Sequence, residues 1–198
     1  MSDSKGTSTR DTKQRIVTAC TELFRRSGYT GTGMKQIAEA AGAPFGSLYH
    51  FFPGGKAQLG EEVIRTSGAV HLGLVAALLE PHADRAAATC DFFAAAADTL
   101  SELDFADPCP VATVALEVAG TNERLRLATS QVFDSWIEEL AAYYAAGGIP
   151  RPVARETASS VIALLEGAFM LGRAARSTAP VLAAGKAAAA VVRAALDG

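Results

Sequence analysis

Cysteine, proline and long apolar runs are all scarce in this sequence. Its three cysteines are widely separated and odd in number, which argues against a disulfide framework. The longest apolar stretches, such as residues 185–196, are interrupted by charged side chains and fall short of the ~20 residues that a membrane span needs. Residues 1–10 are polar with no apolar stretch behind them, so we expect no secretory signal. These absences favour a cytoplasmic protein without membrane spans.

Alanine, by contrast, is abundant. It occupies 41 of the 198 positions, and few β-branched residues alternate as they would in a strand. Because alanine is the best helix former and is poor in strands, we expect an all-α fold. Hydrophobic residues make up 49% of the chain and the net charge is only -3, a combination that excludes a disordered chain and permits a substantial core.

Positive charge is concentrated near the start of the chain. Residues 1–56 contain eight Lys and Arg against four Asp and Glu, a net charge of +4, whereas residues 57–198 carry a net charge of -7. This asymmetry indicates a polyanion as the partner of the N-terminal part alone.

Apolar spacing and breaks at Gly or Pro divide the chain into helices. Residues 1–9 are rich in Ser, Thr and Gly and are interpreted as a flexible arm. Residues 10–55 form a first domain and residues 56–198 a second, which we expect to be a helical bundle. The expected helices lie at about 10–27, 34–41, 44–51, 56–79, 84–104, 110–119, 122–146, 151–176 and 180–197.

Residues 34–52 have the spacing of a helix-turn-helix. Ala38 is a small residue where the two helices would nearly touch, and Gly42 suits the tight turn. Ile37 and Leu48 are branched apolar residues that would lock the crossing of the helices. The second helix of such a motif places its first turn in the major groove of DNA.

The second helix of this motif offers side chains suited to reading DNA. Lys35 and Lys56 add positive charge on either side of it. Tyr49 and His50 could instead close a helical core, but the basic surroundings favour DNA contact. The candidate readers are small or hydrogen-bonding and include no acid that would repel phosphate: Gly46, Ser47, Tyr49 and His50.

Several of these residues share their type and spacing with a known family. They are Gly28-Tyr29, Thr32, Met34, Ile37-Ala38, Ala41-Gly42, Gly46-Ser47-Leu48-Tyr49-His50-Phe51-Phe52 and Lys56. Over about residues 10–60 the sequence resembles the DNA-binding domain of TetR-family transcriptional regulators. Three further runs are similar to the LmrA/YxaF-like subgroup: Asp107-Pro108-Cys109-Pro110-Val111, Val114-Ala115-Leu116-Glu117 and Pro53-Gly54-Gly55-Lys56.

The resemblance implies a role for each matching residue in DNA binding. Thr32 and Lys35 would touch phosphates, and Lys56 would anchor the DNA backbone. The residues on or near the groove would be Phe45, Gly46, Ser47, Tyr49 and His50.

Three positions depart from the family pattern. Gly33 stands where the family often has Ser or Thr to cap the second helix, so that Thr32 or the backbone must serve. Phe45 and Phe51 stand where polar or basic residues are common. We expect Phe51 to pack inward and Phe45 to contact a thymine methyl group.

A homodimer is expected because one recognition helix reads too few base pairs to find a site in a genome. A two-fold dimer would set two such helices about 34 Å apart on a pseudo-palindromic operator of double-stranded DNA. The resemblance places the interface on the last two helices; the alternative is that their residues only complete the monomer's core. The residues concerned are Ala158, Ser159, Ala163, Leu164, Gly167, Leu171, Ala174, Ala188, Ala189, Val191 and Val192.

The resemblance also implies a cavity for a small hydrophobic ligand among the middle helices. Glu117 is a candidate because a carboxylate in an apolar run is costly to bury unless it is paired; pairing with an arginine, or exposure, is the alternative. For each apolar candidate alone, plain core packing is the alternative. These candidates are Phe92, Phe93, Val111, Val114, Phe133, Trp136, Phe169 and Met170.

Together these features predict a ligand-responsive, DNA-binding transcriptional regulator. It would be a repressor that leaves its operator when a ligand favours a state with misplaced recognition helices. Activation, an all-α carrier or enzyme, and a ligand-independent DNA binder are the alternatives. We expect no enzymatic activity, cofactor or metal, because His71 and His82 stand apart from other ligands and no nucleophile motif or phosphate-binding loop is present.

Overall fold

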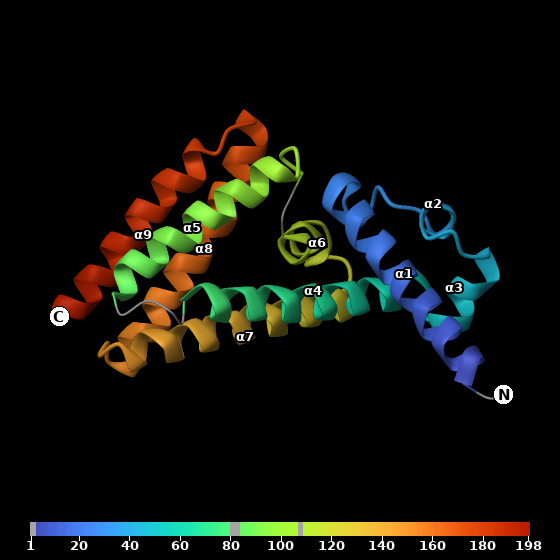
Figure 1. Ribbon diagram of the computed structural model, residues 1–198, viewed down its shortest axis with the longest axis horizontal. Coiled ribbons are helices and arrows are strands. Elements are labelled where there is room, and N and C mark those ends of the chain that lie inside the picture. The colour runs from blue at the N-terminus through green and yellow to red at the C-terminus, as the bar shows by residue number, and fades with distance from the viewer. Residues whose placement is uncertain (1–2, 80–83, 107–108) are drawn as a thin grey trace. The chain divides into compact units, whose positions relative to one another are not determined.

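The computed structural model describes residues 3–79, 84–106 and 109–198 (Figure 1). His82 and the Asp107-Pro108 pair lie outside these residues. Within them every regular element is an α-helix, which agrees with the all-α expectation. The helices are α1 (Asp3–Ser27), α2 (Met34–Ala40), α3 (Phe45–Phe51), α4 (Gly55–Leu79), α5 (Arg85–Glu102), α6 (Pro110–Val118), α7 (Glu123–Ala146), α8 (Arg151–Ala175) and α9 (Ala179–Asp197).

The helix bounds fall within a few residues of their expected positions, except at the start of α1. This helix begins at Asp3 rather than near Arg10, so the backbone of residues 3–9 is helical where a flexible arm was expected. Extending an existing helix costs far less than nucleating one, which lets a Ser- and Thr-rich segment continue the apolar part of α1.

Contacts along the chain divide it into two compact units. Unit 1 comprises residues 1–68 and 109–130, and unit 2 comprises residues 69–108 and 131–198. The expected division at residues 55 and 56 followed sequence order alone. In the structure α6 and the first parts of α4 and α7 group with the N-terminal helices.

Unit 1 is built around α1, which contacts α2 and α6 (Figure 1). Ile16, Cys20 and Phe24 are spaced four residues apart and are fully buried, because that spacing puts them on one face of the helix. Ile37 of α2 and Leu48 of α3 are buried as well. The core of this unit therefore holds α2 and α3 against α1.

Unit 2 contains α5, α8 and α9, which pack side by side (Figure 1). Gly185 allows α9 to approach α5, because a Cβ atom there would lie 2.6 Å from the Cβ of Phe93. Gly172 on α8 would likewise place a Cβ 2.8 Å from Leu100 Cδ2. Small residues thus set the close spacing of these helices.

The two helices α8 and α9 are long and apolar enough to cross a membrane, judged by length and composition alone. The expectation of no membrane span counted only uninterrupted apolar runs. Buried helices of soluble proteins pass the same test, and both helices pack within unit 2. Only 33% of the most apolar stretch of α8 and 28% of that of α9 is buried, so both keep apolar surface open.

Candidate nucleic-acid interface

The turn between α2 and α3 is closed by two backbone hydrogen bonds. The N–H of Ala43 donates to the carbonyl of Ala38 over 3.0 Å, and the N–H of Gly42 donates to that of Glu39 over 3.1 Å. Gly42 has a φ of +56°, the left-handed conformation that glycine adopts most easily. Pro44 is the N-cap residue that precedes α3, with a φ of -56°. The expected helix-turn-helix is therefore present at residues 34–52.

The two faces of α3 have different surroundings. Leu48 is fully buried and fixes the helix to the core of unit 1. Phe45 and Tyr49 are 49% and 47% exposed, and their rings meet edge to face with centroids 5.5 Å apart. Gly46 and His50 are also exposed, and Ser47 is half-buried. Gly46, Tyr49 and His50 thus share the outer face of α3 with Phe45, and Ser47 lies at its edge.

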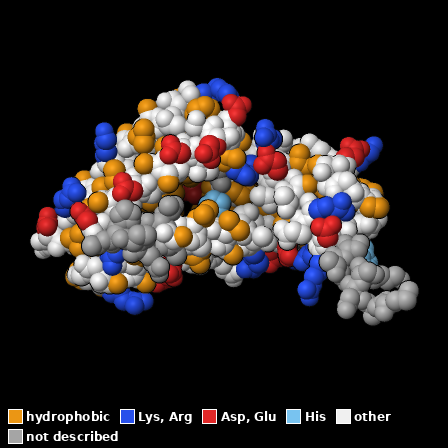
Figure 2. Space-filling view, viewed as in Figure 1, with side chains coloured by type: hydrophobic (Ala, Val, Ile, Leu, Met, Phe, Trp, Pro, Cys, Tyr) orange, Lys and Arg blue, Asp and Glu red, His pale blue; other side chains and the backbone are white. Residues whose placement is uncertain are grey.

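An open hollow of about 430 Å³ lies beside this face of α3. Lys35 and Glu39 bring charges of opposite sign to it. On the face of the molecule in Figure 2, the surface over α1–α3 likewise carries Lys and Arg side chains mixed with Asp and Glu. Lys35 is exposed and free to extend towards a phosphate. The lining residues are Lys35, Ala38, Glu39, Gly42, Ala43 and Phe45.

Thr32 does not have the exposed position that a phosphate contact needs. Its side chain is 1% exposed, and its hydroxyl donates a hydrogen bond of 2.7 Å to the carbonyl of Gly28. Its backbone N–H donates to the carbonyl of Tyr29 over 3.2 Å. The side chain was expected to contact DNA, but it instead closes the turn between α1 and α2.

A side chain that we did not expect, that of Gln36, forms a hydrogen bond at the start of α2. Gly33 has no side chain to cap the helix, and the buried Thr32 hydroxyl is already engaged with Gly28. The carbonyl of the Gln36 side chain accepts from the N–H of Gly33 over 3.4 Å. This is the reverse half of a capping box, so one half of that motif is kept without Ser or Thr.

Lys56 lies at the start of α4 and packs on an aromatic ring. Its ammonium nitrogen is 4.4 Å from the ring centroid of Tyr29, the geometry of a cation–π contact. Partial burial lowers the pKa of Lys56 from its usual value. Lys56 is therefore held towards Tyr29, and only the exposed part of its side chain is open to a partner.

The carboxylate of Glu117 contacts the turn that precedes α2. Oε1 accepts from the N–H of Tyr29 over 3.0 Å, and Oε2 accepts from the N–H of Thr30 over 2.6 Å. Glu117 is exposed, which is one of the two alternatives given above for a buried, ligand-binding carboxylate. Its partners are backbone amides of the same compact unit rather than an arginine. It thus lies beside the helix-turn-helix.

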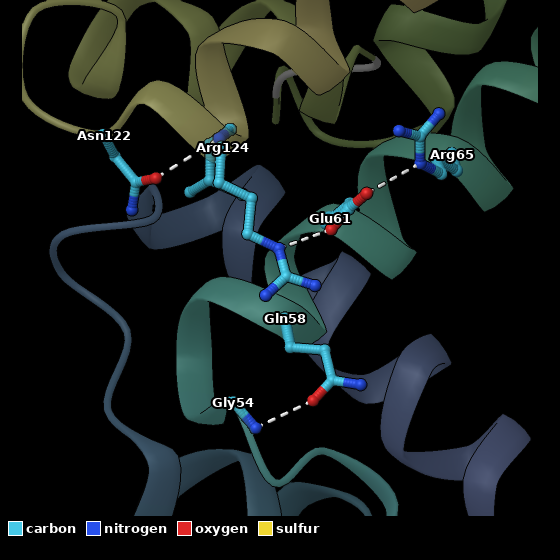
Figure 3. A network of polar contacts seen from close by, with 7 residues as sticks. Gly54, Gln58, Glu61, Arg65, Asn122 and Arg124 are labelled. Atoms are coloured by element: carbon cyan, nitrogen blue, oxygen red, sulfur yellow. Dashed lines mark hydrogen bonds and ion pairs between the residues drawn. The ribbon is translucent and has the colours of Figure 1, made fainter.

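A second polar network joins the start of α7 to α4. Figure 3 shows the carboxylate of Glu61 between Arg124 and Arg65, at distances of 2.5 Å and 3.0 Å. The hydrogen bond from Arg124 is the main cause that holds the pKa of Glu61 below its usual value. One turn earlier, the N–H of Gly54 donates to the side-chain carbonyl of Gln58 over 2.8 Å.

The apolar ligand candidates fall into both compact units. Val111 and Val114 belong to unit 1, where both are fully buried. The others belong to unit 2 with different exposures: Phe93, Trp136 and Phe169 are buried, Phe92 and Phe133 are half-buried, and Met170 is 60% exposed. Trp136 lies within 5.6 Å of His71 and 5.4 Å of Phe133, measured between ring centroids.

The residues expected at a dimer interface also separate into two sets. The buried set completes the core of unit 2: Ala158, Ala188, Ala189 and Val192. The remaining ones are exposed or half-buried: Ser159, Ala163, Leu164, Gly167, Leu171, Ala174 and Val191.

Within the described residues no three His, Cys, Asp or Glu side chains gather as metal ligands would.

Two family models match the chain. The model of bacterial regulatory proteins of the tetR family matches residues 16–63, which hold the helix-turn-helix. The model of the C-terminal domain of LmrA/YxaF-like transcriptional regulators matches residues 86–187. The chain belongs to the TetR family of transcriptional regulators. This TetR-family protein is a DNA-binding regulator of transcription and not an enzyme.

Relatives and solved structures agree with this assignment. The transcriptional regulators YxaF and LmrA of Bacillus subtilis are each 31% identical to this chain. The matches cover 89% and 87% of this chain and 92% of each relative. A TetR regulator from Chloroflexus aurantiacus superposes with a TM-score of 0.77 at 28% identity, covering 94% of this chain and 96% of that one. FadR of Bacillus subtilis, crystallised with stearoyl-CoA, shares the fold with a TM-score of 0.70 at 14% identity, over 90% and 96% of the chains.

Proposed function

We propose that this regulator recognises a pseudo-palindromic operator through the outer face of α3. The observation that carries the proposal is the half-exposed pair Phe45 and Tyr49 on a helix whose opposite face is anchored by Leu48. Aromatic side chains in the major groove contact thymine methyl groups, and the Tyr49 hydroxyl adds a hydrogen-bonding group. His50 and Ser47 flank the pair and supply further hydrogen-bonding groups.

Phosphate contacts would hold α3 in its register on the duplex. Lys35 is the exposed cation beside α3, and Lys56 contributes charge from the start of α4. Such contacts give affinity without sequence information. Thr32 contributes through the turn that it closes, because its hydroxyl is engaged with Gly28.

We propose further that two copies pair through α8 and α9. Leu171 is 58% exposed beside the exposed Met170, and small exposed residues such as Ala163 and Ala174 on the same helix let a second helix approach closely. Apolar surface of this kind on helices of a monomer marks a protein interface. We therefore assign Met170 to this interface rather than to a ligand cavity.

The effector would be a small hydrophobic ligand held within unit 2. The cluster of Trp136, Phe133 and His71, with Phe92 and Phe169 of the same unit, supplies large apolar and aromatic groups. Crystals of the structural neighbour FadR contain stearoyl-CoA, a ligand with a long apolar chain. Ligand binding would favour a state that does not fit the operator. The protein would thus act in the cytoplasm as a repressor that its ligand releases from DNA.

In vitro selection from random-sequence duplex DNA tests the DNA-binding proposal. Wild-type protein should enrich a pseudo-palindrome, and fluorescence anisotropy at fixed salt should then compare that selected duplex with a scrambled duplex of equal length. We expect Tyr49→Ala to weaken binding of the selected duplex about tenfold or more, because each good base contact contributes ~1–3 kcal/mol of discrimination.

Lys35→Gln is the matched control for this variant. It should weaken binding to both duplexes by a similar factor, because a phosphate contact does not depend on sequence. Equal loss of selectivity in Tyr49→Ala and Lys35→Gln would contradict the roles assigned to the two residues. A wild-type protein that binds duplex DNA but enriches no sequence would be a non-specific DNA binder instead.

A further inference from the structure

The contact between Glu117 and the turn before α2 joins residues that are far apart in the sequence. Glu117 lies on α6, and the N–H groups that it accepts from belong to Tyr29 and Thr30. Hydrogen bonds to an ionised carboxylate are about twice as strong as neutral ones, and here both carboxylate oxygens are used. The turn is thus fixed by a group from outside the helix-turn-helix sequence.

Gly28 makes room for this carboxylate. A Cβ atom at Gly28 would overlap the Glu117 carboxylate oxygen and lie 2.8 Å from its carboxyl carbon. Gly28 also has a φ of +73°, which turns the chain sharply at the end of α1. Two separate features of this position therefore require glycine. One is its positive φ, and the other is the space that the Glu117 carboxylate occupies.

The side chain of Tyr29 is held as firmly as its backbone. Its ring meets that of Phe24 edge to face at 5.4 Å between centroids, and the Lys56 ammonium nitrogen lies 4.4 Å from its centroid. Glu117 is one of the charges that raise the pKa of Lys56 against the effect of burial. Glu117, Tyr29 and Lys56 thus form one electrostatically linked group.

The position of this turn sets the start of α2. Thr32 bonds back to Gly28 through its hydroxyl and to Tyr29 through its N–H, and α2 begins at Met34. Ile37 of α2 and Leu48 of α3 are both buried in the core of unit 1, and the two helices contact each other. A shift of the turn would therefore move the outer face of α3.

We propose that Glu117 is a positioning residue for DNA recognition: by holding the Tyr29 and Thr30 amides, it fixes the orientation in which α3 presents Phe45 and Tyr49. This inference rests on the proposed operator recognition by α3. The rest of residues 109–130 stays docked without Glu117, because Val111, Val114 and Val118 are buried and Arg124 binds Glu61. Substitution of Glu117 is therefore expected to loosen the turn and leave unit 1 folded.

The test uses full-length Glu117→Gln and the matched control Glu123→Gln. Both remove one negative charge from unit 1, but Glu123 pairs with Arg126 on its own helix. The probes are the duplex selected by wild-type protein and a scrambled duplex. We expect Glu117→Gln to weaken binding of the selected duplex about tenfold with less than a twofold change for the scrambled one, and Glu123→Gln to match wild type.

Amide hydrogen exchange supplies a second readout on the same proteins. The amides of Tyr29 and Thr30 should exchange at least tenfold faster in Glu117→Gln, while those of α7 keep the wild-type rate. Glu117→Asp keeps the charge on a shorter side chain. Its affinity for the selected duplex and its amide exchange rates should therefore lie between those of Glu117→Gln and wild type. It also serves if Glu117→Gln does not fold.

The outcomes separate this inference from the function on which it rests. A wild-type protein that does not distinguish the two duplexes overturns the proposed recognition by α3 and this inference with it. If wild type distinguishes them and Glu117→Gln does so equally well, only the role of Glu117 is overturned. Unchanged exchange at Tyr29 and Thr30 overturns it as well.

Discussion

At the scale of single residues, side chains for which the sequence suggests the same role differ because of what surrounds them. Thr32 and Lys35 were both expected to contact phosphates, but Thr32 is buried against Gly28 and Lys35 is exposed. Glu117 and Glu39 are both exposed acids of unit 1. Glu117 holds backbone amides, whereas Glu39 lines the hollow beside α3.

Gly28→Ala should destabilise the protein. Alanine at a φ of +73° is strained by about 1 kcal/mol or more, and its methyl group would displace the Glu117 carboxylate. Thermal unfolding followed by circular dichroism should show a Tm that is lower by about 2–4 °C or more.

Gly73→Ala is the control for this substitution. Gly73 is a helical residue of α4, and apart from its chain neighbours and the nearby backbone of its own helix nothing lies within 4 Å of a Cβ placed there. Alanine should leave the stability unchanged or raise it by about 0.5–1 kcal/mol, because it has the higher helix propensity. Equal Tm values for Gly28→Ala and wild type would contradict the close packing of the Glu117 carboxylate against Gly28.

At the scale of elements, the sequence predicts the helix-turn-helix well because its signals are local. Gly42 and Pro44 mark the turn, and the spacing of Ile37 and Leu48 marks the buried faces of α2 and α3. These features act over a few residues, so a single sequence shows them.

The sequence does not show contacts that depend on distant segments. Glu117 lies 88 residues from Tyr29, and no spacing rule connects the two. The burial of Thr32 depends on the turn that Gly28 makes. The Gln36 side chain accepts a hydrogen bond from the N–H of Gly33, a residue that has no side chain of its own to cap α2. Such roles become visible only once the chain is folded.

The apolar surface of α8 leads to a prediction about assembly. Leu171→Asp should convert the proposed homodimer into a monomer, because an interface that buries an unpaired carboxylate loses several kcal/mol. Sedimentation velocity should show the change in mass. Val70→Asp, a substitution of an equally exposed apolar residue on α4, should remain dimeric; a monomeric wild type, or loss of the dimer in both variants, would contradict the assigned interface.

At the scale of the whole molecule, unit 1 holds the helix-turn-helix and unit 2 holds the proposed effector site. The helices α4 and α7 each begin in unit 1 and end in unit 2, so both run from one unit into the other. A regulator of this kind needs two states that a ligand and DNA prefer differently.

The single tryptophan of the chain provides a probe of ligand binding in unit 2. Trp136 is buried beside Phe133 and His71. Titration with a small apolar ligand that binds in unit 2 should change the fluorescence of Trp136 and raise the Kd for the selected duplex over the same concentration range. A fluorescence change without any effect on DNA binding would contradict the proposed coupling of this site to the operator.

Dimethyl sulfate protection on the selected duplex tests the proposed reading of DNA by α3, because this reagent methylates the N7 atom of guanine in the major groove. If the outer face of α3 reads DNA in a two-fold dimer, wild-type protein should protect guanine N7 atoms in two patches about one helical turn, roughly 34 Å, apart. Tyr49→Ala, at a concentration that saturates the duplex, should lose protection at the centre of each patch. A wild-type protein that binds this duplex and leaves all guanine N7 atoms reactive would contradict the account.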